Sequence, residues 1–132
     1  MIRRVLYLGR WTVDFLFAEK EYDIEEVLTF LYDMDADGYI MDECIDLMMR
    51  QAENTGFTYS DPMTHRALVV IGPTSSSEEF LNTLIHEIHH LAVSVAKDLG
   101  VDLEKETPAY IAGDAAMSLA SIVCKLGCSH CK

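Results

Sequence analysis

The chain has 132 residues, which is enough for one domain with a hydrophobic core and too few for two domains of ordinary size. Half of the residues are hydrophobic and 24% are charged, a balance typical of a globular protein rather than a disordered chain. The net charge of −12 argues against nucleic acid or an anionic membrane as a partner, because binding to phosphate groups depends on clustered Lys and Arg.

The first predicted elements are two β-strands joined by a hairpin. Residues 5–8 and 11–18 are rich in β-forming side chains, and Gly9-Arg10 between them suits a tight turn. Apolar and polar residues alternate through the second segment, which is typical of a half-buried strand. Gly9 also ends the first apolar run well short of a signal peptide, and no segment reaches the length of a membrane span. We therefore expect a cytoplasmic protein.

Two helices are predicted next. The first begins with Asp23 as its N-cap, carries acidic residues 25–26 in its first turn, and ends near Asp33. Apolar residues at helical spacing then continue from about residue 40 to residue 53. Asn54-Thr55-Gly56 is a fitting end for this second helix.

The turn between these helices is rich in aspartate. Asp33, Asp35 and Asp37, followed by Gly38, match the first half of an EF-hand calcium loop. The last position of such a loop should carry a glutamate that binds calcium with both oxygens, and here it is Cys44. Two readings stay open: a Ca²⁺ site with a structural role, or an ordinary aspartate-rich turn between helices.

A strand pair and a long helix are predicted in the middle of the chain. Residues 57–59 form a short strand candidate, and residues 67–71 a continuous apolar strand closed by Gly72-Pro73. Ser76 and Glu79, or equally Ser75 and Glu78, then read as a capping box. The helix that follows should run to about residue 98, with its apolar stripe facing the core.

The most specific motif in the chain, H-E-x-x-H, lies on this helix. His86 and His90 are four residues apart, so both imidazoles leave one helix face and can share a metal ion. A zinc ion held in this way lowers the pKa of water, and the neighbouring Glu87 can act as the general base. The motif therefore indicates metal-assisted hydrolysis, although a surface helix that matches by chance would carry the same letters.

The last helix is expected to supply the third zinc ligand. It should begin near Glu106, with Pro108 in its first turn, and continue through residues 119 and 122. The metzincin pattern would need Gly and His at the positions of Val93 and Ala96, so that branch is excluded. Several small residues on this helix are expected to let another helix pack very close; they are Ala109, Ala112, Gly113, Ala115 and Ala116.

The segment Glu106-Thr107-Pro108-Ala109-Tyr110 resembles the E-x-x-A-Y element that follows H-E-x-x-H in short gluzincin-like zinc metallopeptidases of phages and mobile elements. The resemblance implies a small α+β zincin-like domain, with a short mixed or antiparallel sheet packed on the H-E-x-x-H helix and a C-terminal helix. It makes Glu106 the third zinc ligand and gives Tyr110 a role in polarising the substrate carbonyl or holding a ligand. Other carboxylates stay open as the third ligand: Asp98, Asp102, Glu104 and Asp114.

The expected function is hydrolysis of a peptide or protein substrate, with the peptide extended beside an edge strand near residues 67–71. A catalytically inactive, metal-stabilised interaction protein is the alternative, and a calcium-responsive module is a third possibility. Cys124, Cys128 and Cys131 suit either a second metal site or incidental thiols in a loose tail over residues 125–132. His65, in a turn, is expected at the surface.

Overall fold

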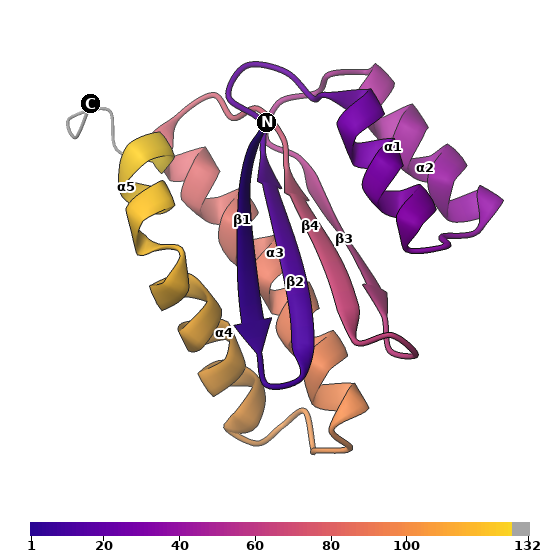
Figure 1. The fold of residues 1–132 in the computed structure, drawn as a ribbon. Coiled ribbons are helices and arrows are strands. Elements are labelled where there is room, and N and C mark those ends of the chain that lie inside the picture. The colour runs from indigo at the N-terminus through magenta and orange to yellow at the C-terminus, as the bar shows by residue number, and fades with distance from the viewer. Residues whose placement is uncertain (128–132) are drawn as a thin grey trace.

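A four-stranded mixed sheet lies between two layers of helices in the computed structural model, which describes residues 1–127 (Figure 1). The strands are β1 (Ile2–Leu8), β2 (Trp11–Phe17), β3 (Gly56–Asp61) and β4 (Arg66–Ile71). Their order across the sheet is β1-β2-β4-β3, with two antiparallel hairpins joined by a parallel pairing of β2 with β4. The expected α+β class with a short mixed sheet is confirmed.

The two central strands are buried on both faces. Leu16 and even Asp14 are buried in β2, so the prediction of a half-buried strand is wrong. Asp14 is tolerated there because Arg3 of β1 holds its carboxylate at 2.7 Å. Residues 67–71 do not form an edge either, because β4 lies between β2 and β3. The free edge on that side of the sheet is β3.

Five helices of residues 1–127 cover the two faces of the sheet. Helices α1 (Ile24–Asp33) and α2 (Gly38–Met49) cover one face. The opposite face is covered by α3 (Ser77–Asp98), α4 (Thr107–Ser118) and α5 (Ala120–Gly127). The predicted caps of α1 and α3 are confirmed, because the side chains of Asp23 and Ser76 each accept a backbone hydrogen bond of 3.1 Å. Helix α2 ends at Met49, about a turn earlier than expected.

The aspartate-rich turn does not have the form of a calcium loop. Helix α2 already begins at Gly38, where an EF-hand loop would still be extended. Asp37 instead caps α2, accepting a 2.9 Å bond from the backbone N–H of Ile40. Within residues 1–127, no three side chains of His, Cys, Asp or Glu are grouped so that they could hold a metal ion. Asp33, Asp35 and Asp37 therefore do not form such a group.

The C-terminal helical segment is broken rather than continuous. Helix α4 stops at Leu119, whose backbone leaves the helical conformation, and α5 continues at 64° to it. Residues 125–127, expected in a loose tail, belong to α5. Among the small residues of α4, Ala115 is buried, but Gly113 is exposed and a Cβ added there would meet no atom within 4 Å. Close packing of helices therefore does not depend on Gly113.

No single helix in the described part of the chain is long and apolar enough to cross a membrane. Helices α4 and α5 reach that length and composition only when they are counted together across their bend. Ala115, Leu119 and Ile122 of this pair are buried in the protein core.

Asp98 joins the C-terminal end of α3 to the turns of both hairpins. Its Oδ2 atom accepts a 3.1 Å hydrogen bond from the indole N–H of Trp11 and lies 3.3 Å from Nε2 of His65. Arg10 lies 3.8 Å from the same oxygen. His65, expected to be a surface residue, is thus partly covered and paired with Asp98. These contacts also give Asp98 a structural role away from His86 and His90.

Substitution Asp98→Ala is expected to lower the free energy of unfolding by about 1–3 kcal/mol, because the indole N–H of Trp11 would be buried without an acceptor. Trp11 is only 1% exposed, so water cannot replace the lost partner. Urea denaturation followed by tryptophan fluorescence measures the change. The control is Asp114→Ala on the exposed side of α4, for which we expect a change below about 0.5 kcal/mol. Equal losses in the two variants would contradict the role of Asp98.

Cys44 of α2 is expected to be an unreactive thiol. Burial, with a smaller effect of the neighbouring Glu43 carboxylate, raises the pKa of Cys44 to about 11. The thiol therefore stays protonated at pH 8, and only the thiolate is a good nucleophile. Alkylation with iodoacetamide at pH 8, followed by peptide mass spectrometry, should label the exposed Cys124 before Cys44. Labelling of both at similar rates would contradict this assignment.

Candidate metal and catalytic site

The H-E-x-x-H residues of α3 open toward the β3 edge of the sheet. His86, Glu87 and His90 border a surface hollow of about 560 Å³, together with Thr58 of β3. Helix α3 takes this orientation because its apolar stripe packs on the sheet, which leaves the histidines at the margin of the helix. The predicted position of the motif beside the core stripe is confirmed.

The two histidines lie side by side on one face of α3. Their Nε2 atoms lie 3.2 Å apart. Two nitrogens bound to a tetrahedral zinc ion at about 2.0–2.1 Å would be about 3.3 Å apart. The His86 side chain is 67% exposed, so an ion can reach it from solvent. This separation matches two ligands of one zinc ion, and it is also that of an N–H···N hydrogen bond between the rings.

Glu87 lies beside this pair in a fixed orientation. It is only 4% exposed, and its Oε2 atom lies 3.9 Å from Nε2 of His86. The hydroxyl of Thr58 donates a 3.0 Å hydrogen bond to the other carboxylate oxygen, Oε1. One oxygen is thus held by the strand while the other faces the histidines. The carboxylate is therefore held in one orientation next to His86.

Thr58 was not identified as a site residue from the sequence. It belongs to the predicted strand 57–59, but its partner Glu87 lies 29 residues away in the chain. Alternation in a strand shows which residues share a face, and it does not show which helix covers that face. The only sign of its role in the sequence was that Thr58 is a polar residue between Phe57 and Tyr59.

Gly56 allows β3 and α3 to approach closely at this site. A Cβ added at Gly56 would lie 2.6 Å from the carbonyl oxygen of Val70 and 3.2 Å from Cγ of Glu87. Any larger residue would therefore clash with the backbone of β4 and crowd the side chain of Glu87. The prediction that Gly56 ends the second helix is wrong, because α2 ends at Met49 and Gly56 begins β3.

Tyr22 is a buried residue that supports the chain just before β3. Its hydroxyl donates a 3.1 Å hydrogen bond to the backbone oxygen of Thr55, which precedes β3. Burial raises the pKa of Tyr22, the hydrogen bond with Thr55 lowers it, and the negative charge of Glu87 raises it again. Tyr22 is thus a neutral, buried support for the start of β3.

The resemblance to gluzincins also named Glu106 and Tyr110, and the structure does not bring them to the histidines. Helix α4 lies on the β1 side of α3 (Figure 1). His86 and His90 instead line a hollow with Gly56, Phe57 and Thr58 of β3. Leu84, Ile88 and Val95 of α3 share the buried core with Ala115 and Leu119 at the α4 side. Glu106 is exposed where α4 begins, and Tyr110 is 67% exposed.

No other carboxylate in residues 1–127 completes a three-ligand site. Among these residues, no three side chains of His, Cys, Asp or Glu are grouped closely enough to hold a metal ion. Asp98 is bonded to Trp11, and Asp102 accepts a 2.9 Å bond from the backbone N–H of Glu104. Asp114 is exposed on α4. The described donor set is therefore His86 and His90, with Glu87 beside them.

The remaining candidates lie away from this site or outside the described residues. Cys124 is exposed on α5, and Cys128, His130 and Cys131 lie outside residues 1–127. His89 is exposed next to His90, with their ring centres 6.2 Å apart. Comparison with protein-family models, with curated proteins and with solved structures gives no match for this chain. Its chemistry is therefore inferred from the geometry of its own residues.

Proposed function

We propose that the protein is a zinc-dependent peptidase in which His86 and His90 hold the metal and Glu87 is the general base. The observation that carries this proposal is the pair of imidazole nitrogens 3.2 Å apart, with a buried carboxylate directly beside them. When bound, zinc would supply a Lewis acid that polarises the scissile carbonyl and makes water more acidic. Within residues 1–127, Cys44 and Cys124 are both free thiols, which suits the cytoplasmic location that we also propose.

The residues of the chain have distinct tasks in this mechanism. Thr58 holds Glu87 Oε1 by a hydrogen bond, which leaves Oε2 on the side of His86 Nε2. In that position Glu87 accepts a proton from the attacking water and then passes it to the amine that leaves the cleaved peptide bond. His86 and His90 bind the metal through their neutral imidazole nitrogens.

A peptide is the favoured substrate class because the site lies beside an edge strand. The backbone of an extended peptide can pair with β3, which is hydrogen-bonded to β4 on one side only. Thr58 belongs to this strand and also contacts Glu87, so a paired peptide would pass the carboxylate at close range. The resemblance to gluzincin-like peptidases supports the same class.

The test is digestion of an unstructured peptide library by the purified protein with one equivalent of zinc. Mass spectrometry should detect new peptide termini that disappear when a chelator is added and return when zinc is restored. Cleavage that persists in the chelator would identify a contaminating protease. Absence of cleavage with one zinc bound per chain would reject the peptidase.

The second candidate is a metal-stabilised interaction protein without turnover. The specific observation in its favour is that residues 1–127 provide two metal-ligating histidines and no grouped third ligand. For this function, zinc should raise the melting temperature while no peptide is cleaved. The same digestion experiment, accompanied by a thermal melt with and without zinc, separates the two candidates.

A further inference from the structure

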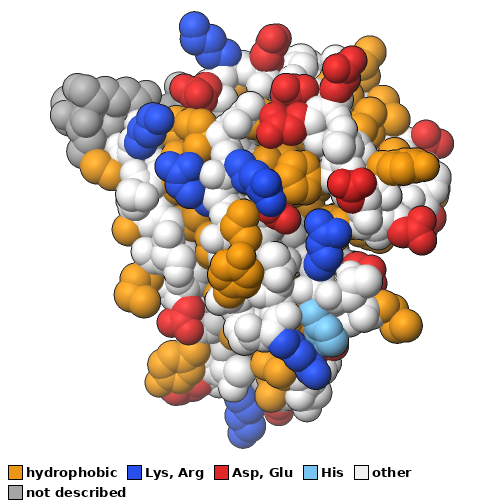
Figure 2. Space-filling view, viewed as in Figure 1, with side chains coloured by type: hydrophobic (Ala, Val, Ile, Leu, Met, Phe, Trp, Pro, Cys, Tyr) orange, Lys and Arg blue, Asp and Glu red, His pale blue; other side chains and the backbone are white. Residues whose placement is uncertain are grey.

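The two edges of the sheet are protected differently. β1 carries the exposed Arg3 and Arg4, and Lys and Arg side chains gather over this part of the surface (Figure 2). Charged side chains on an edge strand discourage pairing with another strand. The other edge, β3, has the sequence Gly-Phe-Thr-Tyr-Ser before its only charged residue, Asp61. Within the described residues, β3 is therefore the edge that is open to strand addition.

The hydrogen bonding of β3 with β4 shows which backbone groups are free. The N–H of Gly72 donates to the carbonyl of Thr55 at 2.9 Å, so hydrogen-bonded pairs continue at every second residue. Phe57 and Tyr59 therefore direct their backbone groups toward β4. Residues 56, 58 and 60 direct theirs away from the sheet, where a further strand can bond to them.

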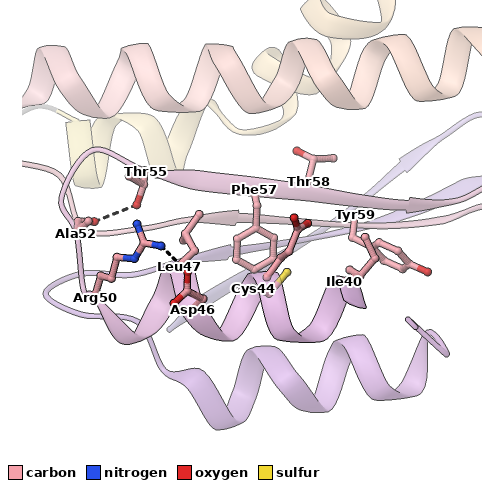
Figure 3. A pocket seen from close by; sticks show the side chains of 11 residues that line it. Ile40, Cys44, Asp46, Leu47, Arg50, Ala52, Thr55, Phe57, Thr58 and Tyr59 are labelled. Atoms are coloured by element: carbon pink, nitrogen blue, oxygen red, sulfur yellow. Dashed lines mark hydrogen bonds and ion pairs between the residues drawn. The ribbon is translucent and has the colours of Figure 1, made fainter. Parts of the chain in front are cut away.

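The side chains of β3 alternate between two different environments. Thr58 points toward α3, where it bonds Glu87, while Phe57 points to the α2 side (Figure 3). On that side, Phe57 and Tyr59 line a cavity of about 500 Å³ with apolar residues of α2. The α2 residues that line it with apolar side chains are Ile40, Cys44 and Leu47. Leu47 also lines a second, smaller hollow of about 290 Å³ with His86 and Glu87, so the cavity reaches the margin of the candidate site.

The cavity also has a negative end. Burial raises the pKa of Tyr59, and the carboxylates of Asp61, Asp37 and Asp35 raise it further in that order. Glu43 of α2 lines the cavity directly, so a carboxylate also belongs to its wall. At the other end, Arg50 is already paired with Asp46. A peptide that carries positive charge complements this surface better than an acidic one.

We propose that β3 and this cavity form a specificity site for an extended, positively charged peptide with a large apolar side chain. A residue opposite Thr58 directs its side chain toward His86 and Glu87, and the adjoining residue directs its side chain into the cavity. The occupant is thus a Leu, Met or Phe next to the peptide bond that would be cleaved. The position of the cleaved peptide bond in this inference rests on the proposed function. The binding of the peptide rests only on the edge strand and the cavity.

The test measures binding separately from cleavage. Fluorescein-labelled eight-residue peptides with two lysines and a central Leu, Ala or Asp are titrated with the protein in a chelator, and anisotropy gives each Kd. Burial of the side chain should make the Leu peptide bind about tenfold tighter than the Ala peptide. N-methylation of the backbone nitrogen that pairs with β3 should weaken binding by at least about tenfold.

Two variants of α2 test whether the apolar side chain of the peptide binds in the cavity. Leu47→Lys should remove the preference for Leu, whereas the control Met49→Lys should keep it, because Met49 is 67% exposed and does not line the cavity. Ile40→Ala is the second cavity variant and adds no charge, so it tests the same wall if Leu47→Lys fails to fold. It should reduce the preference for Leu severalfold.

Equal affinity for the Leu and Ala peptides would overturn the proposal, as would an equal effect of the cavity variants and Met49→Lys. A dimer in sedimentation experiments that excludes the peptide would show that a second copy of the chain occupies β3 and would also overturn it. Selective binding without any cleavage in zinc would reject the peptidase and keep this site. Cleavage with no preference for apolar residues would reject this site alone.

Discussion

Substitution Glu87→Gln is expected to reduce the rate of peptide hydrolysis by about 10²–10⁴-fold, the usual contribution of a general base. The amide has the shape of the carboxylate, and its oxygen can still accept the bond from Thr58, but it cannot take a proton from water. Zinc affinity should stay within about threefold, because Glu87 is a neighbour of the histidines and not a ligand in our proposal. Cleavage rates by chromatography and zinc titration by calorimetry measure the two effects.

The matched control for this variant is Glu106→Gln. Glu106 is exposed at the start of α4, so the same chemical change there should leave the rate of hydrolysis within about twofold. A rate that falls equally in both variants would contradict the assignment of Glu87. Hydrolysis that survives Glu87→Gln would show that another group activates water.

The zinc content of His86→Ala is expected to fall from one ion per chain to almost none. Loss of a group that only supports a metal ligand already costs about 10–100-fold in affinity, so loss of one of two histidine ligands should cost at least about 100-fold. Elemental analysis after gel filtration measures the bound zinc, and far-UV circular dichroism checks that the variant is folded. His90→Ala should behave in the same way because the two Nε2 atoms are equivalent partners.

Two further variants make the zinc experiment specific. His89→Ala removes an exposed histidine outside the metal-binding pair and should retain zinc. Glu106→Gln should also retain it, since α4 places this residue on the other side of α3. Zinc lost in Glu106→Gln would show that the resemblance to gluzincins holds at this position and that α4 moves when metal binds.

Local signals in the sequence predicted the helices of the fold well, because their causes lie within a few residues. The caps at Asp23 and Ser76 are short-range hydrogen bonds, so both helix starts could be predicted. The pairing of strands was harder to predict. The parallel contact of β2 with β4 joins Thr12 to Arg66, and no periodicity within either strand reports it. This contact places β4 inside the sheet, and Leu16 is buried in the core that α1 and α2 form on one face.

In the candidate site, too, local relations could be predicted from the sequence and tertiary contacts could not. The relation of His86 to His90 follows from helical spacing alone, and the structure places their nitrogens together. Thr58 and Gly56 come from a separate strand, so their role depends on tertiary packing that the sequence does not display. Glu106 was named by a resemblance in sequence. Glu106 can reach the histidines only if α4 packs on their side of α3. The side on which α4 packs depends on the tertiary packing of the whole core.

The parallel seam between β2 and β4 also bears on how the chain folds. The segment from Gly56 to Asp98 contains β3, β4 and α3 in succession, so its contacts close short loops. Docking of the β1–β2 hairpin must instead close a loop from Thr12 to Arg66, and such long-range pairing forms slowly. The histidines, Glu87 and Thr58 all belong to the locally connected segment. The geometry proposed for catalysis is therefore expected to form before the sheet is complete, with closure of the seam as the slower step.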